Sequence, residues 1–248
     1  KAAKLYEEIL AKPLRVLYVT HTPSYEYRFL KNALVEDREL HVHCLLTSAD
    51  HDFPQERSKR PEDPRFEESL TSLPGDLLGY DVVLLGDAKQ VDPKPLSSFV
   101  REYGGGLVLL AGRDAPGELM PVVTDDERKP ESYDSVLELD KPNSRHPIVR
   151  LWTDGNLPTG VTWLKRVREV KAWGQTVLTM AAQPFAVAGT SGRGRVLWLG
   201  SDEAWRWRYQ TGDFPWFYPF FQTAIEWAAG GDAPSDDDWI RKADLIVK

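Results

Sequence analysis

The chain has 248 residues, of which 42% are hydrophobic and 28% charged, and its formal net charge is −7. This composition is ordinary for a globular protein, and the length fits one large α/β domain with a substantial core. The acidic balance argues against nucleic-acid binding, which normally leaves a basic footprint. The single cysteine, Cys44, excludes an internal disulfide and a cysteine-based zinc cluster.

The first half of the chain alternates between predicted strands and predicted helices. Apolar runs bounded by turn residues indicate the strands, and apolar residues at helical spacing indicate the helices. We expect strands at 14–20, 40–47, 80–86 and 107–110, and helices at 2–11, 24–37 and 96–103. The segment 48–74 is charged and contains prolines, which predicts a long surface loop with one helical turn. The βαβα order predicts a doubly wound, mostly parallel sheet.

The second half has a different pattern. Residues 161–189 look like antiparallel strands, with turns at Gly174 and near Pro184, and a hairpin turn at 190–194 leads into a buried strand at 194–200. An amphipathic helix is expected at 217–229. The predicted fold class is therefore α/β: a flavodoxin-like three-layer sandwich with an antiparallel elaboration from the middle of the chain.

This pattern also predicts the domain organisation. We expect a lead-in helix at 1–12, one domain at 13–229 that contains the elaboration at 122–190, and a linker and tail at 230–248. No apolar run reaches the roughly 18–20 residues that span a bilayer. No signal peptide is visible. Because the chain begins at Lys1 rather than Met and ends at 245–248 without a polar tail, we expect a fragment of a larger protein.

Ligands of open parallel sheets bind at the carboxyl ends of the strands, so the candidate residues are those that follow predicted strands. They are His21 and Tyr25 after the first strand, Asp87 after the third, Arg113 and Asp114 after the glycine-rich strand, and Ser201, Asp202, Glu203, Trp205, Arg206, Trp207 and Arg208 after the last. We expect these groups to meet at one edge of the sheet.

A resemblance to a known family rests on three stretches. They are the strand that ends at Asp87, the Gly-Gly-Gly strand at 104–110, and the late strand with its Ser-Asp-Glu end at 194–203. This order resembles the class I glutamine amidotransferase-like superfamily. The resemblance implies a cysteine nucleophile at Ala111 or Gly112, and a His-x-Glu pair at Ser201 and Glu203.

The catalytic groups that the resemblance implies are largely missing. Neither Ala111 nor Gly112 supplies a thiolate, and Ser201 supplies no imidazole base. The chain is therefore expected not to release ammonia from glutamine and to need no cofactor. The stretches 25–30, 146–151 and 194–209 resemble a branch found within membrane-anchored bacterial multidomain proteins, some with von Willebrand A-type regions.

Two functions remain open, besides a purely structural spacer. In the first, the Trp-Arg-Trp-Arg segment, with Tyr25, Arg113 and Asp202, grips a small molecule, another domain of the same polypeptide or a partner protein, although the aromatic residues also suit a structural wedge. The alternative is a hydrolase for a sugar or ester, as in trehalose-utilisation-type relatives. His21 is then the base, oriented by Asp87 or Asp114.

Two further histidines, His41 and His43, share a face of one predicted strand. Metal ligands with that spacing need a third partner, and no residue with recognisable spacing supplies one. We therefore expect no metal site.

Overall fold

The computed structural model describes residues 13–59, 61–87, 91–111, 116–130, 136–143, 145–152, 157–158, 161–209 and 217–230. The predicted lead-in helix at 1–12 and most of the predicted tail lie outside the described residues. So do three predicted site residues, Gly112, Arg113 and Asp114.

The structure contains the predicted strands and α-helices of the described residues in the expected order, and it adds strands β5 and β6 and several 3₁₀ helices that the sequence did not predict. The strands are β1 (Leu14–Thr20), β2 (Leu40–Leu46), β3 (Val82–Leu85), β4 (Gly106–Leu110), β5 (Val122–Pro130), β6 (Leu137–Leu139), β7 (Trp163–Val170), β8 (Gly174–Met180), β9 (Gln183–Ser191) and β10 (Gly194–Leu199). The α-helices are α2 (Tyr25–Glu36), α3 (Pro93–Arg101) and α4 (Phe217–Ala228), and short 3₁₀ helices are η1 (Pro64–Phe66), η2 (Lys141–Asn143), η3 (Pro147–Trp152) and η4 (Ala204–Tyr209).

Eight strands form the main sheet, in the order β2-β1-β3-β4-β10-β9-β8-β6. The pairs from β2 to β10 are parallel, and the pairs from β10 to β6 are antiparallel. Strands β5 and β7 form a small antiparallel sheet of their own. The predicted α/β class, with a mostly parallel sheet and antiparallel strands from the middle of the chain, is confirmed.

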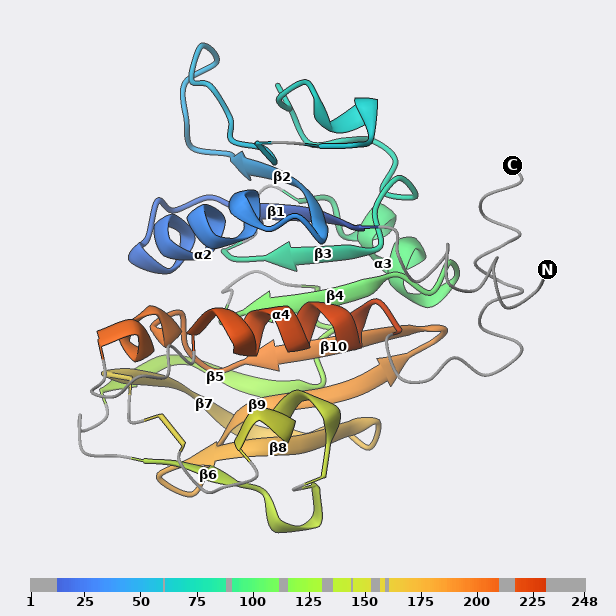
Figure 1. The fold of residues 1–248 in the computed structure, drawn as a ribbon. Coiled ribbons are helices and arrows are strands. Elements are labelled where there is room, and N and C mark those ends of the chain that lie inside the picture. Colours follow the sequence, from blue (N-terminus) through green and yellow to red (C-terminus); the bar gives the residue numbers. More distant parts are fainter. Residues whose placement is uncertain are drawn as a thin grey trace, which may run out of the picture.

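Each face of the main sheet carries its own core. On one face, Val16 and Tyr18 of β1 join the buried residues of α2 and α4, and Figure 1 shows both helices on that side. On the other face, Leu17 and Val19 join buried residues of α3, together with Val122 of β5. Because both faces are covered, the central strands are continuous apolar runs rather than alternating ones.

The helices begin where polar caps satisfy their first amide groups. The Ser24 hydroxyl accepts a hydrogen bond from the Tyr27 amide at 3.1 Å, so α2 begins at the next residue, Tyr25. Helix α3 begins at Pro93, three residues before the predicted start, because Asp92 accepts a hydrogen bond from the Lys94 amide. Proline is well suited to the first turn of a helix.

The loops also follow the predictions. The segment 48–74 contains one 3₁₀ turn, η1, whose Phe66 side chain is buried against β2. The hairpin between β9 and β10 turns at Gly192, which has a φ of 62° and allows close approach to the backbone of Arg101. Cys44 is buried in β2, as its apolar alternation indicates.

Candidate functional site

The predicted site lies at the carboxyl ends of the parallel strands. In Figure 1 the arrowheads of β3, β4 and β10 point toward the same end of the molecule, and η4 lies there beside the start of α2. Residues that follow β1, β3, β4 and β10 therefore share one edge, as the topology rule for open sheets predicts.

Asp87 follows β3 and fixes the turn after β1. Its carboxylate accepts hydrogen bonds from the Thr20 hydroxyl at 2.9 Å, the His21 amide at 2.8 Å and the Thr22 amide at 2.9 Å, and from the Thr22 hydroxyl. Burial alone raises the pKa of Asp87, but these hydrogen bonds outweigh it and hold the pKa below its usual value. The β1 and β3 ends approach so closely that a Cβ at Gly86 would lie 2.5 Å from the Thr20 hydroxyl oxygen.

The His21 imidazole lies apart from that carboxylate contact. Its Nδ1 is 3.0 Å from the Thr47 hydroxyl oxygen, whereas Asp87 contacts His21 through the backbone amide. The structure thus brings His21 and Asp87 together, but the Asp87 carboxylate orients the backbone of the turn after β1 and does not contact the His21 ring. A general base of the kind expected for a hydrolase needs its ring to be oriented by the carboxylate.

Ala111, the last described residue after β4, has an unusual backbone conformation and no nucleophilic side chain. Ala111 has a φ of 45°, a left-handed conformation that non-glycine residues rarely adopt, and its amide donates to the Leu199 carbonyl of β10 at 2.9 Å. Ser201, at the position that the resemblance assigns to a histidine, is buried, and its hydroxyl has no hydrogen-bond partner among the described residues.

Glu203 is fully engaged in holding η4. Its carboxylate accepts hydrogen bonds from the Thr162 amide and hydroxyl, and it forms an ion pair with Arg206 at 2.9 Å. Burial raises the pKa of Glu203, but the bonds from Arg206 and Thr162 outweigh it and lower the pKa below its usual value. This carboxylate therefore has a structural task at the strand end.

Glu26, which sequence analysis did not single out, is a buried carboxyl in the first turn of α2. It accepts a hydrogen bond from the Trp205 amide at 2.8 Å. Burial raises the pKa of Glu26 well above its usual value; the Trp205 bond opposes this, while the nearby charges of Asp202 and Glu203 add to it. Its spacing of four residues from the buried Leu30 is the sequence signal that points to an inward-facing side chain.

Four rings from α2 and η4 form a surface that we call the aromatic patch: Tyr25, Phe29, Trp205 and Tyr209. The Tyr25 and Trp205 ring centroids are 5.0 Å apart, and Phe29 lies 6.0 Å from both Trp205 and Tyr209. Tyr25 is 60% exposed and Tyr209 is 67% exposed. Sequence analysis identified Tyr25 and Trp205 but missed Phe29 and Tyr209, because only the fold brings α2 and η4 together.

Three arginines surround the aromatic patch. The guanidinium carbon of Arg206 lies 4.5 Å from the Trp205 ring centroid, and that of Arg208 lies 4.6 Å from the Phe29 centroid. Arg28 approaches Phe29 at 5.7 Å. Such contacts contribute about 0.5–2 kcal/mol each. Trp207 is not part of this surface, because its side chain is fully buried beside Phe185 and other core rings.

His41 and His43 have structural partners. The His41 Nε2 accepts a hydrogen bond from the Glu62 amide at 3.1 Å, and the His43 Nδ1 lies 2.7 Å from the Tyr80 hydroxyl. Burial lowers the pKa of both imidazoles. Within the described part of the chain, no group of three or more His, Cys, Asp or Glu side chains is arranged to hold a metal ion.

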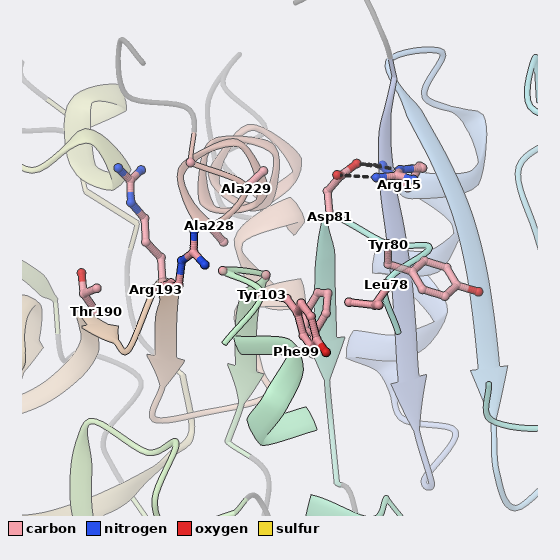
Figure 2. Close-up of a pocket in the computed structure, with 14 residues that line it drawn as sticks. Arg15, Leu78, Tyr80, Asp81, Phe99, Tyr103, Thr190, Arg193, Ala228 and Ala229 are labelled. Atoms are coloured by element: carbon pink, nitrogen blue, oxygen red, sulfur yellow. Dashed lines mark hydrogen bonds and ion pairs between the residues drawn. The ribbon is translucent and has the colours of Figure 1, made fainter. Parts of the chain in front are cut away.

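A cavity of about 280 Å³ lies at the opposite, amino edge of the sheet. Figure 2 shows residues that line it, among them the Arg15–Asp81 ion pair and Arg193. The Arg193 side chain donates to the Glu102 carbonyl after α3, and Arg195 donates to the Trp227 carbonyl near the end of α4. Arginines that bind the last carbonyls of helices stabilise helix ends, so these cations have a structural explanation. A second cavity of about 350 Å³ lies between β2 and the loop at 69–73.

Comparisons with known proteins give the fold but no family. No family model matches the chain, and no curated protein matches it. Among the described residues, no helix combines the length and the apolar character of a membrane span.

Solved structures resemble the chain at low sequence identity. A cytoplasmic protein from Salmonella typhimurium is 15% identical and has a TM-score of 0.58, over 87% of this chain and 98% of its own. A second cytoplasmic protein from that organism, also 15% identical, has a TM-score of 0.55 over 88% of this chain and 98% of its own. A beta-galactosidase from Rahnella is 12% identical, with a TM-score of 0.53 over 89% of this chain and 32% of the enzyme. These likenesses establish a mixed α/β fold shared with bacterial proteins, and nothing beyond the fold.

Proposed function

We propose that this chain is a non-catalytic binding domain that recognises another protein segment through the aromatic patch. The proposed scaffold is flavodoxin-like and of the amidotransferase type, and the parent is a membrane-anchored bacterial protein. The parallel part of the sheet, with the order β2-β1-β3-β4-β10, supports a flavodoxin-like scaffold because that fold has the order 2-1-3-4-5.

The observation that carries this proposal is the exposure of the aromatic patch. Tyr25 and Tyr209 are more than half exposed, although they pack against Phe29 and Trp205. Tryptophan, tyrosine and arginine are the residue types enriched at the energetic centres of protein interfaces. Buried Glu26 and half-buried Glu203 hold the η4 segment that carries Trp205 and Tyr209, so the rings are fixed before a partner arrives.

The strand ends support the absence of catalysis. Ala111, which follows β4, carries only a methyl group, and the buried Ser201 hydroxyl has no hydrogen-bond partner among the described residues that could act as its base. Glu203 is bound to Thr162 and Arg206. The hydrolase alternative has less support, because the Asp87 carboxylate is saturated by the β1 turn and the His21 ring contacts Thr47.

A site-specific crosslinking experiment tests the binding function. A photo-crosslinking residue replaces Tyr209 in the full-length parent protein, and the control carries it at Tyr103, which is exposed at the opposite edge of the sheet. We expect Tyr209 to give a discrete crosslink that Trp205→Ala removes, and Tyr103 to give none. Equal crosslinking at the two positions would contradict the proposal.

A turnover assay tests the absence of catalysis. We expect ammonia release from glutamine, and hydrolysis of nitrophenyl esters and glycosides, to match the buffer blank. Ammonia release that Glu203→Gln abolishes, or hydrolysis that His21→Ala abolishes, would show an enzyme and overturn the proposal.

A further inference from the structure

The charges around the aromatic patch identify the kind of segment that it binds. We propose that the patch takes an acidic protein segment, in which two carboxylates pair with Arg28 and Arg208 and an apolar side chain packs on Tyr25 and Tyr209. This inference rests on the proposed function, because it names the partner of the same surface.

Arg28 and Arg208 combine two features: each guanidinium lies near an aromatic ring of the patch, and neither has an acidic partner of its own among the described residues, unlike several other arginines of the chain. Arg15 pairs with Asp81, Arg150 with Glu226, and Arg206 with Glu203. Across the described residues, neither Arg28 nor Arg208 lies within ion-pair distance of a carboxylate. Both are exposed, and both guanidinium groups lie near the Phe29 ring, at 5.7 and 4.6 Å.

This arrangement favours an acidic partner over a neutral one. A guanidinium over an aromatic ring keeps its N–H groups available at its edge, where they match the two oxygens of a carboxylate. A neutral ligand such as a sugar would leave both cations without a counter-charge. A nucleic acid is disfavoured, because the chain carries a net charge of −7 and only a local positive patch here.

The rings supply the apolar part of the recognition. The Tyr25, Phe29, Trp205 and Tyr209 centroids lie between 5.0 and 6.3 Å from their neighbours, so they form one continuous surface. An apolar side chain of the partner removes the exposed ring faces of Tyr25 and Tyr209 from water. Charge at the side and stacking at the centre are the usual division of an interface.

Two labelled peptides of equal length test the inference with the 248-residue chain. One carries glutamate and aspartate around a central leucine and tryptophan, and the other has glutamine and asparagine at the acidic positions. Fluorescence anisotropy measures their binding. We expect the acidic peptide to bind about tenfold more tightly, and about 1 M salt to remove most of that difference.

Matched arginine variants locate the effect. Arg28→Gln and Arg208→Gln are each expected to weaken the acidic peptide about threefold, and the double variant about tenfold, with little change for the neutral peptide. Arg193→Gln, an exposed arginine at the opposite edge, is the control and is expected to leave binding unchanged. Thermal melting checks that each variant is folded.

The outcomes separate this inference from the proposed function. If both peptides bind equally and Tyr209→Ser weakens both, the patch is a binding surface but its partner is not acidic. If the acidic peptide fails to bind, or if its binding ignores Arg28 and Arg208, the inference is overturned even when Tyr209 crosslinks specifically. Equal crosslinking at Tyr209 and Tyr103 overturns the proposed function itself.

Discussion

Three carboxyl groups near the carboxyl edge of the sheet have pKa values that are shifted in different directions. Burial raises the pKa of all three, but hydrogen bonds outweigh it at Asp87 and Glu203 and lower the pKa there. Glu26 has the Trp205 amide as its hydrogen-bond donor, and its pKa stays well above the usual value. The number of donors that face a buried carboxylate therefore decides the direction of its shift.

Replacement of Glu26 by glutamine is expected to stabilise the protein at alkaline pH. A carboxyl whose pKa is raised on folding contributes stability below its unfolded value of 4.5, and that contribution is lost as the pH rises through the folded value. Glutamine stays neutral and still accepts the bond from the Trp205 amide. We expect Glu26→Gln to raise the free energy of unfolding at pH 8 by about 1–3 kcal/mol, and urea denaturation across the pH range measures this.

The control for this measurement is Glu36→Gln, which makes the same chemical change at an exposed position of the same helix. The advantage of Glu26→Gln should shrink as the pH falls toward 4.5, because the wild-type carboxyl is then protonated as well. A constant difference at every pH would mean that the charge of Glu26 is not the cause.

Within the short helix η4, Trp205 and Trp207 contribute differently to stability because they differ in burial. Trp207 is fully buried and lies edge-on to Trp152 and Phe220, whereas Trp205 stacks in the half-exposed aromatic patch. We expect Trp207→Ala to lower the free energy of unfolding by about 3–5 kcal/mol, and Trp205→Ala by about 1–2 kcal/mol. Denaturation measures both values, and similar losses at the two sites would contradict this division.

The hairpin between β8 and β9 contains a removable backbone strain. Its two turn residues, Ala181 and Ala182, are exposed and have φ values of 48° and 58°. Glycine adopts such angles without the penalty of a Cβ, which exceeds the entropy that glycine adds to the unfolded chain. We expect Ala182→Gly to stabilise the protein by about 0.5–1 kcal/mol.

Ala172→Gly provides the matched control for that prediction. Ala172 is exposed in the neighbouring turn between β7 and β8, and it is not among the residues with positive φ. At Ala172 the substitution only adds entropy to the unfolded chain, so we expect the free energy of unfolding to fall by about 0.4–1 kcal/mol. Thermal melts of both variants measure the two effects. A lower melting temperature for Ala182→Gly than for the wild type would show that the backbone at Ala182 is not strained.

At the scale of elements, the sequence predicted most strands and several of the side chains that lie at the carboxyl edge of the sheet. Apolar runs such as 107–110 identify strands that are buried on both faces, and the rule for strand ends located Asp87 and Glu203 at one edge. The sequence could not show that Trp207 is buried while Trp205 is partly exposed, because this difference depends on how η4 packs. It also missed the contact of Glu26 with η4, whose partners are 179 residues apart in the chain.

For the whole molecule, the two faces of the sheet separate the aromatic patch from the buried histidines of β2. The aromatic patch belongs to the face with α2, whereas on the other face His43 stacks on Phe66 and lies edge-on to its partner Tyr80. The elements at 122–191 extend the sheet on its far side and add β5 and β7 over the second face. A partner that binds the patch therefore leaves the second core undisturbed.

Several shifted groups predict that the folded protein loses stability in acid, whereas Glu26, with its raised pKa, acts in the opposite direction. Burial lowers the pKa of His41 and His43, so the unfolded chain binds more protons just below pH 6.5, and stability falls as the pH drops through that region. Asp63, whose hydrogen bonds with Arg65 lower its pKa to about 2, extends the loss to lower pH, as do Asp87 and Glu203.

The substitution His41→Gln tests whether His41 contributes to the loss of stability just below pH 6.5. The glutamine amide oxygen still accepts the bond from the Glu62 amide, but it takes up no proton. We expect the free energy of unfolding of His41→Gln to fall less than that of the wild type between pH 7 and about 5.5. His51→Gln, at an exposed histidine, is the control. If urea denaturation gives parallel curves for His41→Gln and the wild type, His41 has no part in the acid response, and the loss must begin at the carboxylates.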